Sequence, residues 1–300
     1  MKPMRAKLRS RREGSTNSGS STGATLWLWL TVPVAILTAV AAGSELLVDG
    51  IFRGDAQYFV AQAIGQDVIT LGVALPALIG GAIFADHGSG RARLVWLGTL
   101  TYLVYTYVIY AFQVQFNSLF LVYVALLGCS LYALIGGLAT TDSARIKAGF
   151  TRKTPVRTVS IFLAIVAVCF YVSWLGEVVP ALLGGGVPQS VTVNGTPTNG
   201  VHVLDMAWML PAMGLTAIWL WRKLALGYAL AGALLTFMSL LLLAIIGMVV
   251  SMSLHGQPVA PEMAVVFAAV AATSLVLTVW YLKKLSGDHP AATDDSIGQL

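Results

Sequence analysis

Two residues able to do acid–base or ligand chemistry stand one helical turn apart in the stretch TPTNGVHVLDMAWMLP, residues 196–211. His202 and Asp205 place an imidazole and a carboxylate side by side, because residues three apart lie on the same face of a helix. Such a pair can bind a divalent transition metal, hold a cation or a proton, or hydrogen-bond a polar substrate. The pair stands where a long apolar run begins, at the border between water and an apolar interior.

A third candidate, Glu177, lies in the apolar stretch YVSWLGEVVPALL, residues 171–183. A carboxylate inside a membrane costs about 3 kcal/mol unless it is paired, hydrated or protonated, which makes it a candidate functional residue. No Lys or Arg lies within any long apolar run of the chain. The partners open to Glu177 are therefore His202, His255, a tyrosine or a bound cation.

A metal site would draw on His202, Asp205, His255 and Glu177, which together offer three or four ligands to a divalent ion. The chain contains no HExxH or HxxxH motif to support such a site. The same region also has a structural interpretation. Asn199 is a suitable N-cap for the helix that follows, and Asp205 gains from the dipole of that helix.

Composition identifies the elements that must position these residues. The chain has 300 residues, of which 57% are hydrophobic and only 10% are charged, whereas soluble domains carry about 25% charged residues. Apolar stretches of about 20 residues indicate transmembrane helices. The sequence predicts an all-α, polytopic bundle of about eight spans, at 25–47, 67–85, 94–113, 117–139, 157–182, 202–221, 228–252 and 264–282.

The predicted organisation is one transmembrane domain, residues 25–285, between two polar ends. Residues 1–24 form a basic, Ser- and Gly-rich head and residues 286–300 a short polar tail. Neither has enough apolar residues to fold alone, so both are expected to be disordered and cytoplasmic.

The basic residues predict the orientation of the spans. Lys and Arg concentrate on the cytoplasmic side of a membrane. With both termini in the cytoplasm, 17 of the 18 Lys and Arg residues lie inside and only Arg53 lies outside. The net charge of +5 is thus a topology signal and gives no reason to expect a nucleic-acid partner. The predicted location is a cytoplasmic (plasma) membrane, with the lipid bilayer as the main partner.

This orientation brings polar residues from several spans to the outer face. Asp67 opens span two, Asn117 opens span four and His255 closes span seven. The candidate ligand-binding residues are therefore Glu177, His202, Asp205, Asp67, Asn117 and His255.

Local patterns add four expectations. Residues 59–68 suggest a short helix on the outer surface that leads into span two. The tyrosines of span three face the bundle interior, and spans three and four form an antiparallel hairpin. The SVTV run before Asn194 and Gly195 could form a short β-hairpin. No convincing internal repeat is visible in the sequence.

Several classes of protein lack a residue that they require. No span carries the lysine of a retinal Schiff base or the arginine repeats of a voltage sensor. The chain has no Walker A motif and no GxSxG elbow. Its two cysteines, Cys129 and Cys169, do not form a CxxC pair, which argues against thiol-oxidising chemistry.

Three stretches resemble a group of bacterial multi-pass membrane proteins with no assigned activity. They are GQDVITLGVALP (65–76), LVYTYVIYAFQVQFNSLFLVYVALLGCSLYAL (103–134) and GTPTNGVHVLDMAWMLP (195–211). The resemblance implies a bacterial origin. It places Asp67, Asn117, His202 and Asp205 in the recurring stretches.

Three functions fit the sequence. The leading one is a small transporter or binder of a cation or polar solute, with an outward-facing polar pocket between spans two to seven. The second is a membrane-embedded enzyme that uses the same residues, with a divalent metal as its cofactor, on a lipid or envelope substrate. The third is a non-catalytic membrane subunit of a larger complex.

Overall fold

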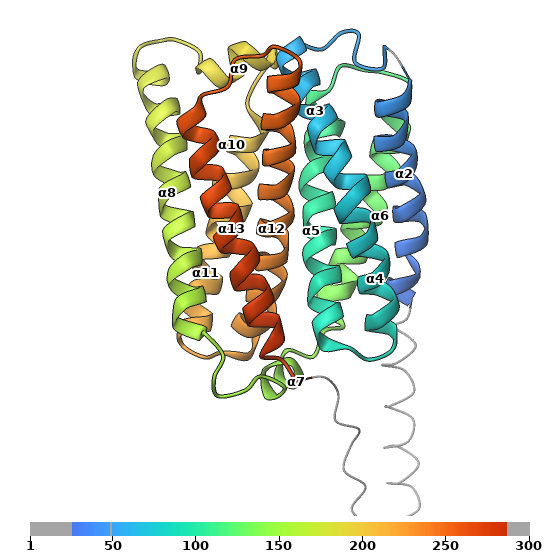
Figure 1. Cartoon of the computed structure of the whole chain (residues 1–300), viewed down its shortest axis with the longest axis vertical. Coiled ribbons are helices and arrows are strands. Elements are labelled where there is room, and N and C mark those ends of the chain that lie inside the picture. Colours follow the sequence, from blue (N-terminus) through green and yellow to red (C-terminus); the bar gives the residue numbers. More distant parts are fainter. Residues whose placement is uncertain (1–25, 49, 287–300) are drawn as a thin grey trace, which may run out of the picture.

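The computed structural model describes residues 26–48 and 50–286, and every regular element within them is a helix. Eight helices are long and apolar enough to cross a membrane, and they stand side by side as one bundle (Figure 1). The chain is therefore a multi-pass integral membrane protein, as its composition predicts. The segments expected to be disordered, 1–24 and 286–300, lie outside the described residues except for Ser286.

The first span runs from Leu26 to Leu47 and contains α2. In chain order the elements are α2 (Thr31–Leu47), α3 (Gln57–Ile69), η1 (Thr70–Ala74), α4 (Leu75–Asp86), α5 (Gly90–Gln113), α6 (Phe120–Ala139), α7 (Ser143–Ala148), α8 (Val156–Leu183), α9 (Gln189–Asn194), α10 (Gly200–Leu204), η2 (Asp205–Met209), α11 (Leu210–Trp221), α12 (Ala225–Leu254) and α13 (Pro261–Lys283).

The sequence predicts a surface helix before span two, and the structure differs there. The segment is α3, the first part of one continuous transmembrane helix, Gln57–Asp86. Gly65 of α3 lies so close to α12 that an added Cβ atom would clash with the backbone carbonyl group of Gly247. Two glycines facing each other let the helix backbones approach, which gives the close packing that holds helices together in a membrane. This contact places α3 inside the bundle.

The second half of the bundle repeats the first at a shift of 135 residues, which the sequence alone does not make apparent. The π-helical segment η1 begins at Thr70 and η2 begins at Asp205. In the same register, α4 and α11 end at Asp86 and Trp221. The buried positions of the two helices are also related by the shift of 135 residues. Residues 70, 74, 78, 81, 82 and 85 are buried in the first half, and residues 205, 209, 213, 216, 217 and 220 are buried in the second.

Proline explains why both helices contain a π-helical segment at the same place. The sequence Leu-Pro-Ala follows each segment, with Pro76 in the first half and Pro211 in the second. Proline has no backbone N–H, and its ring clashes with the carbonyl group four residues earlier. A wider π turn just before the proline accommodates that break.

The turns after these helices also match. Gly88 and Lys223 occupy the same position of the repeat, and both have positive φ, at 90° and 57°. Lys223 is the one non-glycine residue with positive φ among those described. A lysine adopts a conformation that favours glycine because the turn of the repeat requires it. Each half contains four spans, so the two halves cross the membrane in the same direction.

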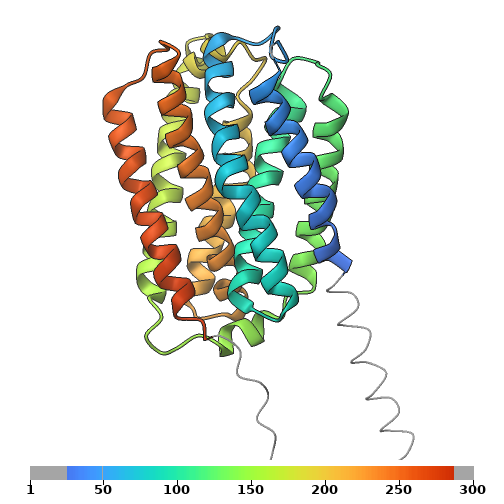
Figure 2. The same ribbon diagram turned by 45° about the vertical axis from the view of Figure 1, so that its right-hand side comes forward.

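The two halves meet where α12 packs against both α3 and α5 in the middle of the bundle. In Figure 2, α12 (dark orange) lies between α13 and the blue-to-teal helix that contains α3 and α4. α5 and α6 form the predicted antiparallel hairpin. The predicted inward-facing tyrosines of α5 are buried: Tyr102, Tyr105, Tyr107 and Tyr110 are at most 3% exposed.

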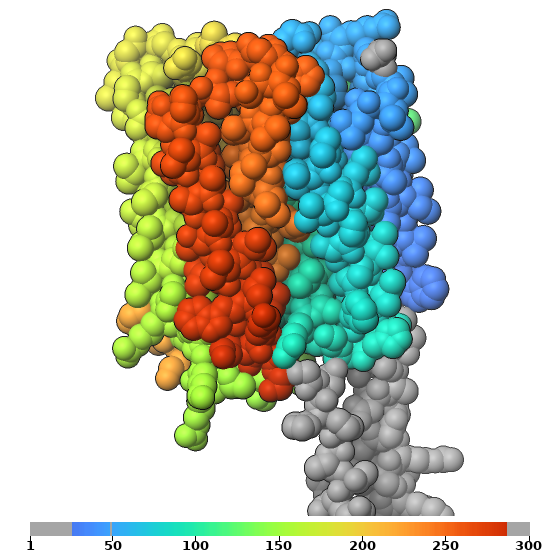
Figure 3. Space-filling model, viewed as in Figure 1, coloured from blue at the N-terminus to red at the C-terminus, as the bar shows by residue number. Residues whose placement is uncertain are grey.

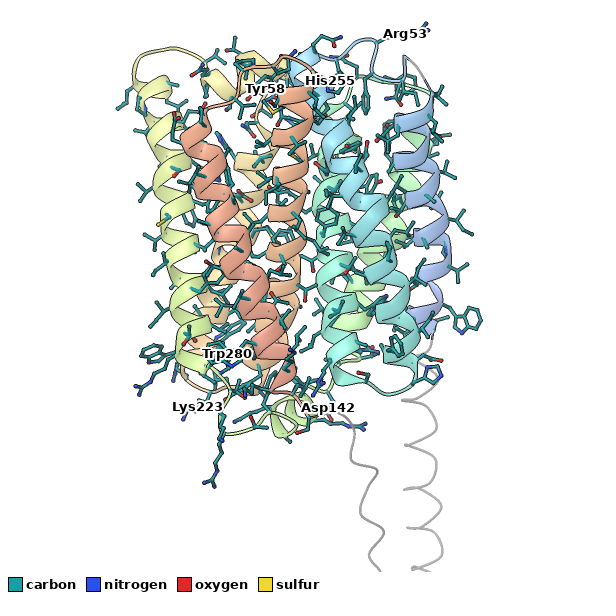
Figure 4. The ribbon with its side chains drawn as sticks, in the orientation of Figure 1. Arg53, Tyr58, Asp142, Lys223, His255 and Trp280 are labelled. Atoms are coloured by element: carbon teal, nitrogen blue, oxygen red, sulfur yellow. The ribbon has the colours of Figure 1, made fainter. Side chains whose placement is uncertain are left out.

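The basic residues are distributed unequally between the two ends of the bundle. Eleven of the twelve described Lys and Arg residues lie at the end that carries α7, and Arg53 lies at the end that carries α9. Figure 4 shows Arg53 and His255 at the α9 end and Lys223 and Asp142 at the α7 end. The predicted β-hairpin near the α9 end is wrong, because the SVTV run forms the helix α9 and Gly195 ends it with φ at 65°.

The Gly65–Gly247 contact yields a prediction. Gly65→Ala should lower the free energy of unfolding by about 1–3 kcal/mol, the usual cost of overpacking, because the new methyl group meets rigid backbone. Thermal unfolding of the detergent-purified protein measures the loss. Gly80→Ala in the same span is the matched control, since nothing lies within 4 Å of its Cβ position. Equal unfolding temperatures for the two variants would contradict the contact.

Candidate functional site

A cavity of about 420 Å³ lies at the α9 end, where α3, α5, α8, α10, α12 and α13 converge. Figure 3 shows the face on which α13 lies across the bundle between α8 and the helices of the first half. α8 packs extensively only against α11, which leaves room between α8 and α12. Small-molecule sites in proteins are commonly about 300–1,000 Å³, so the cavity has the size of a ligand site.

The walls of the cavity differ in polarity. The hydrogen-bonding side chains come mainly from α3, α5 and the segment of α9, α10 and their loop; they include Gln62, Gln66, Tyr105, Gln113, His202 and Asp205. The side chains from α12, α13 and the loop between them are all apolar; they include Phe237, Met238, Met248, Met252, Met263 and Phe267. The cavity therefore has one wall that can form hydrogen bonds and one wall that cannot.

His202 is held from three sides. Asn199 caps α10, as predicted, and its side-chain oxygen accepts a hydrogen bond from the backbone N–H of His202 at 3.2 Å. The imidazole ring lies 4.5 Å from the ring of Trp174, centroid to centroid. Its Nε2 atom is 3.5 Å from Oε2 of Glu177. The structure thus brings two of the candidate residues, His202 and Glu177, into contact.

Asp205 occupies the first position of η2 and is almost fully buried. Its Oδ1 accepts a hydrogen bond from the hydroxyl group of Tyr105 at 3.0 Å, and its Oδ2 accepts one from Nε1 of Trp174 at 2.8 Å. Trp174 therefore contacts both His202 and Asp205 and joins them into one cluster. We call His202, Asp205, Glu177, Trp174 and Tyr105 the His–Asp cluster.

Glu177 is less isolated than the apolar sequence around it suggests. Its side chain is 29% exposed, and its Oε1 accepts a hydrogen bond from the backbone N–H of Ser190 at 2.8 Å. The chain after α8 folds back over the end of that helix and supplies this donor. The carboxylate therefore lies at the rim of the cavity, where it holds both α9 and His202.

The other three candidates lie elsewhere. Nδ1 of His255 is 2.7 Å from the backbone oxygen of Ser251, within its own helix. Asn117 begins the turn before α6, where its side chain accepts a hydrogen bond from the backbone N–H of Leu119. Asp67 is buried on the first-half side of α5. The six candidates are thus not one site.

The four proposed metal ligands are not brought together. Within residues 26–48 and 50–286, no group of three or more His, Cys, Asp and Glu side chains is placed to hold a metal ion. The reason lies in the contacts of each candidate: Asp205 is engaged by Tyr105 and Trp174, and His255 by its own helix.

Two important residues are not singled out by the sequence. Trp174 precedes Glu177 by three positions and so shares its helix face, a signal that could have identified it. Gln66 lines the cavity and donates a hydrogen bond to the hydroxyl group of Thr106 at 3.0 Å. Nothing local in the sequence marks Gln66, because its position depends on the packing of α3 against α12.

In comparisons with protein-family models, curated proteins and solved structures, nothing matches the chain. The function is therefore argued from the cavity and its side chains.

The Asp205 contacts yield a second prediction. Asp205→Asn should lower the free energy of unfolding by about 1–3 kcal/mol, because an amide cannot accept from both donors and leaves one buried N–H or O–H without a partner. Thermal unfolding in detergent measures the effect. Asp86→Asn is the control, since Asp86 is exposed at the α7 end. A variant as stable as this control would show that Asp205 does not hold Tyr105 and Trp174.

Proposed function

We propose that this integral membrane protein binds a small amphipathic molecule in the cavity at its α9 end. The polar part of the ligand lies against α3, α5 and α10, near the His–Asp cluster, and the apolar part lies against α12 and α13. The observation that carries the proposal is the division of the cavity into a hydrogen-bonding wall and an apolar wall.

The apolar wall suits a flexible hydrocarbon group. Met238, Met248, Met252 and Met263 contribute to it. Methionine side chains are unbranched and polarisable, so they adapt to irregular apolar ligands. A hydrated cation or a purely polar solute would find no hydrogen-bond partner on this side. The wall therefore favours an amphipathic ligand over the cation or polar solute that the sequence alone suggested.

The charged side chains around the cavity limit the charge that the polar part of the ligand can carry. Asp205 lines the cavity and Glu177 lies at its rim, whereas no Lys or Arg is among the described residues that line it. An anionic group would enter without a counter-charge, and burying an unpaired charge is costly. The polar part is therefore neutral or cationic, and Gln62, Gln66 and Gln113 can hydrogen-bond it.

The residues around the cavity favour binding of a ligand over transport of a solute through the bundle. Met213, Phe237 and Leu210 line the cavity toward the middle of the bundle and are apolar. The hydroxyl groups of Thr70, Ser130 and Ser173 donate to carbonyl groups of their own helices, and that of Thr106 accepts a hydrogen bond from Gln66, so each is already engaged within the protein. We therefore infer a binding protein that takes its ligand from one side of the membrane.

That side is the outside. Lys and Arg concentrate on the cytoplasmic side of membranes, and they concentrate here at the α7 end. The α9 end and the cavity then face away from the cytoplasm, in a bacterial cytoplasmic membrane as the resemblance implies.

Cysteine labelling tests the orientation. In a chain whose two native cysteines are replaced by alanine, Thr198→Cys should react with a membrane-impermeant maleimide in intact cells, because its exposed side chain lies in the loop after α9. Thr151→Cys, exposed at the α7 end, should react only after the membrane is permeabilised. The reverse pattern would place the cavity on the cytoplasmic side.

Blocking the cavity tests the ligand. Ala264 lines it from α13, so Ala264→Trp should fill the space and reduce the amount of bound amphiphile severalfold. Organic extraction of the purified protein followed by mass spectrometry measures the neutral and cationic amphiphiles that remain bound.

Ala268→Trp is the matched control, because Ala268 is one helical turn further along α13, is exposed and does not line the cavity. The control should retain the same amphiphile as the unaltered chain. If Ala264→Trp retains as much as Ala268→Trp, the cavity is not the binding site.

A further inference from the structure

A second cluster of acids lies in the first half of the bundle, away from the His–Asp cluster. The carboxyl groups of Glu45, at the end of α2, and Asp67, in α3, lie side by side, and the rings of the tyrosines that bind them, Tyr123 and Tyr110, are 5.6 Å apart. Glu45 is 7% exposed and Asp67 is 1% exposed. The hydroxyl group of Tyr123 donates to Oε1 of Glu45 at 2.5 Å, and that of Tyr110 donates to Oδ1 of Asp67 at 3.2 Å.

Each acid keeps one oxygen that has no hydrogen-bond donor. Oε2 of Glu45 and Oδ2 of Asp67 are buried and receive no hydrogen bond from any described residue. Two carboxylates in contact cannot both be ionised unless a counter-ion lies between them. A single proton removes the conflict, because it turns one carboxyl group into a donor for the other.

No basic side chain neutralises the pair. The titratable groups that face it are tyrosines of α5 and α6: Tyr102, Tyr107, Tyr110 and Tyr123. α12 packs on the other side of α3, and its one titratable group at this end is His255, which is bound to its own helix. Arg53 of the nearby loop is exposed. The pair must therefore be balanced by something other than an Arg or Lys of these elements.

Tyr107 provides independent evidence that the cluster is built to hold something. Its side chain is fully buried, and its hydroxyl group has no partner among the described residues. Its ring lies 5.5 Å from the ring of Tyr110 and 6.3 Å from that of Tyr123, the two tyrosines that bind the acids. A buried hydroxyl group without a partner is costly, so its retention beside the acid pair points to a polar site.

We propose that Glu45 and Asp67 form a proton-binding site inside the membrane, in which one proton is shared between the two carboxyl groups. In the occupied site one carboxyl group donates its O–H to the other, which stays ionised, and the tyrosine hydroxyl groups stabilise the remaining negative charge. Release passes the proton to water and leaves two carboxylates that repel each other until a proton returns from water, so the step needs no reactant besides water.

The site has polar neighbours on both sides. Tyr123 contacts Asn117, which lines an opening between the loops at the α9 end. In that loop region Asp55 accepts a hydrogen bond from the backbone N–H of Gln115, and burial raises the pKa of Asp55. Tyr110 contacts Asp67 and also lines the ligand cavity. One hydrogen bond therefore separates the acid pair from the cavity, but the proton site does not depend on any ligand there.

Infrared spectroscopy of the detergent-purified full chain tests the proposal. At neutral pH the unaltered protein should show the C=O stretch of a protonated carboxyl group. Glu45→Gln and Asp67→Asn should each abolish that band, because the new amide N–H donates in place of the shared proton and leaves the remaining acid ionised. Two acids protonated independently would instead leave half of the band in each variant, which would overturn the shared proton.

The control is Glu262→Gln, an exposed position at the start of α13, which should leave the band unchanged. Thermal unfolding verifies that each variant is folded before its spectrum is compared. Absence of the band in the unaltered protein, together with an unfolding temperature that rises with Na⁺ concentration, would overturn the proposal and assign the pair to a bound monovalent cation.

Discussion

The bundle depends on two buried hydroxyl groups of α5, those of Tyr102 and Tyr105, which need hydrogen-bond partners inside an apolar interior. A polar group left without a partner in hydrocarbon costs several kcal/mol. Tyr102 meets the hydroxyl group of Thr70 at 2.8 Å, and Tyr105 donates to Asp205 at 3.0 Å. Thr70 and Asp205 are equivalent positions of the internal repeat, each the first residue of a π-helical segment. α5 of the first half thus hydrogen-bonds to the equivalent position of each half, and these two bonds fix how the halves join.

The two halves use this shared framework differently. In the first half, α2 packs against α3, α4 and α6, and the space beside α5 is filled by the tyrosines and the Glu45–Asp67 pair. In the second half, α8 packs against α11, and the cavity lies between α8 and α12. Position 67 of the first half corresponds to His202 of the second, so each half places a polar residue one turn before its π-helical segment. The repeat therefore produces one closed polar site and one open site.

Much of the fold follows from the sequence because its causes are local. Span length and hydropathy specify the eight helices, the Asn199 cap specifies the start of α10, and short loops specify neighbouring helices. The sequence is less informative where a contact joins distant segments. The depth of α3 depends on Gly65 meeting Gly247, 182 positions later. Likewise, the sequence offers His202 as a partner of Glu177 but does not identify Ser190, because the chain that covers Glu177 has no pattern that predicts its return. The candidate site was therefore only partly foreseen: His202, Asp205 and Glu177 come together, whereas Asp67, Asn117 and His255 do not join them.

The π-helical segments explain how one helix can serve both a polar site and a packed core. A π turn holds one more residue than an α turn, so it rotates the helix before it relative to the helix after it. Before the segment, Asp67 and His202 face polar partners on α2, α5 or α8. After it, small residues such as Gly81 and Ala217 face the packed interior toward the α7 end. A straight helix with this spacing would turn one of these two faces toward lipid. The proline that breaks each helix is thus the residue that aligns its polar half with the Glu45–Asp67 pair or the His–Asp cluster.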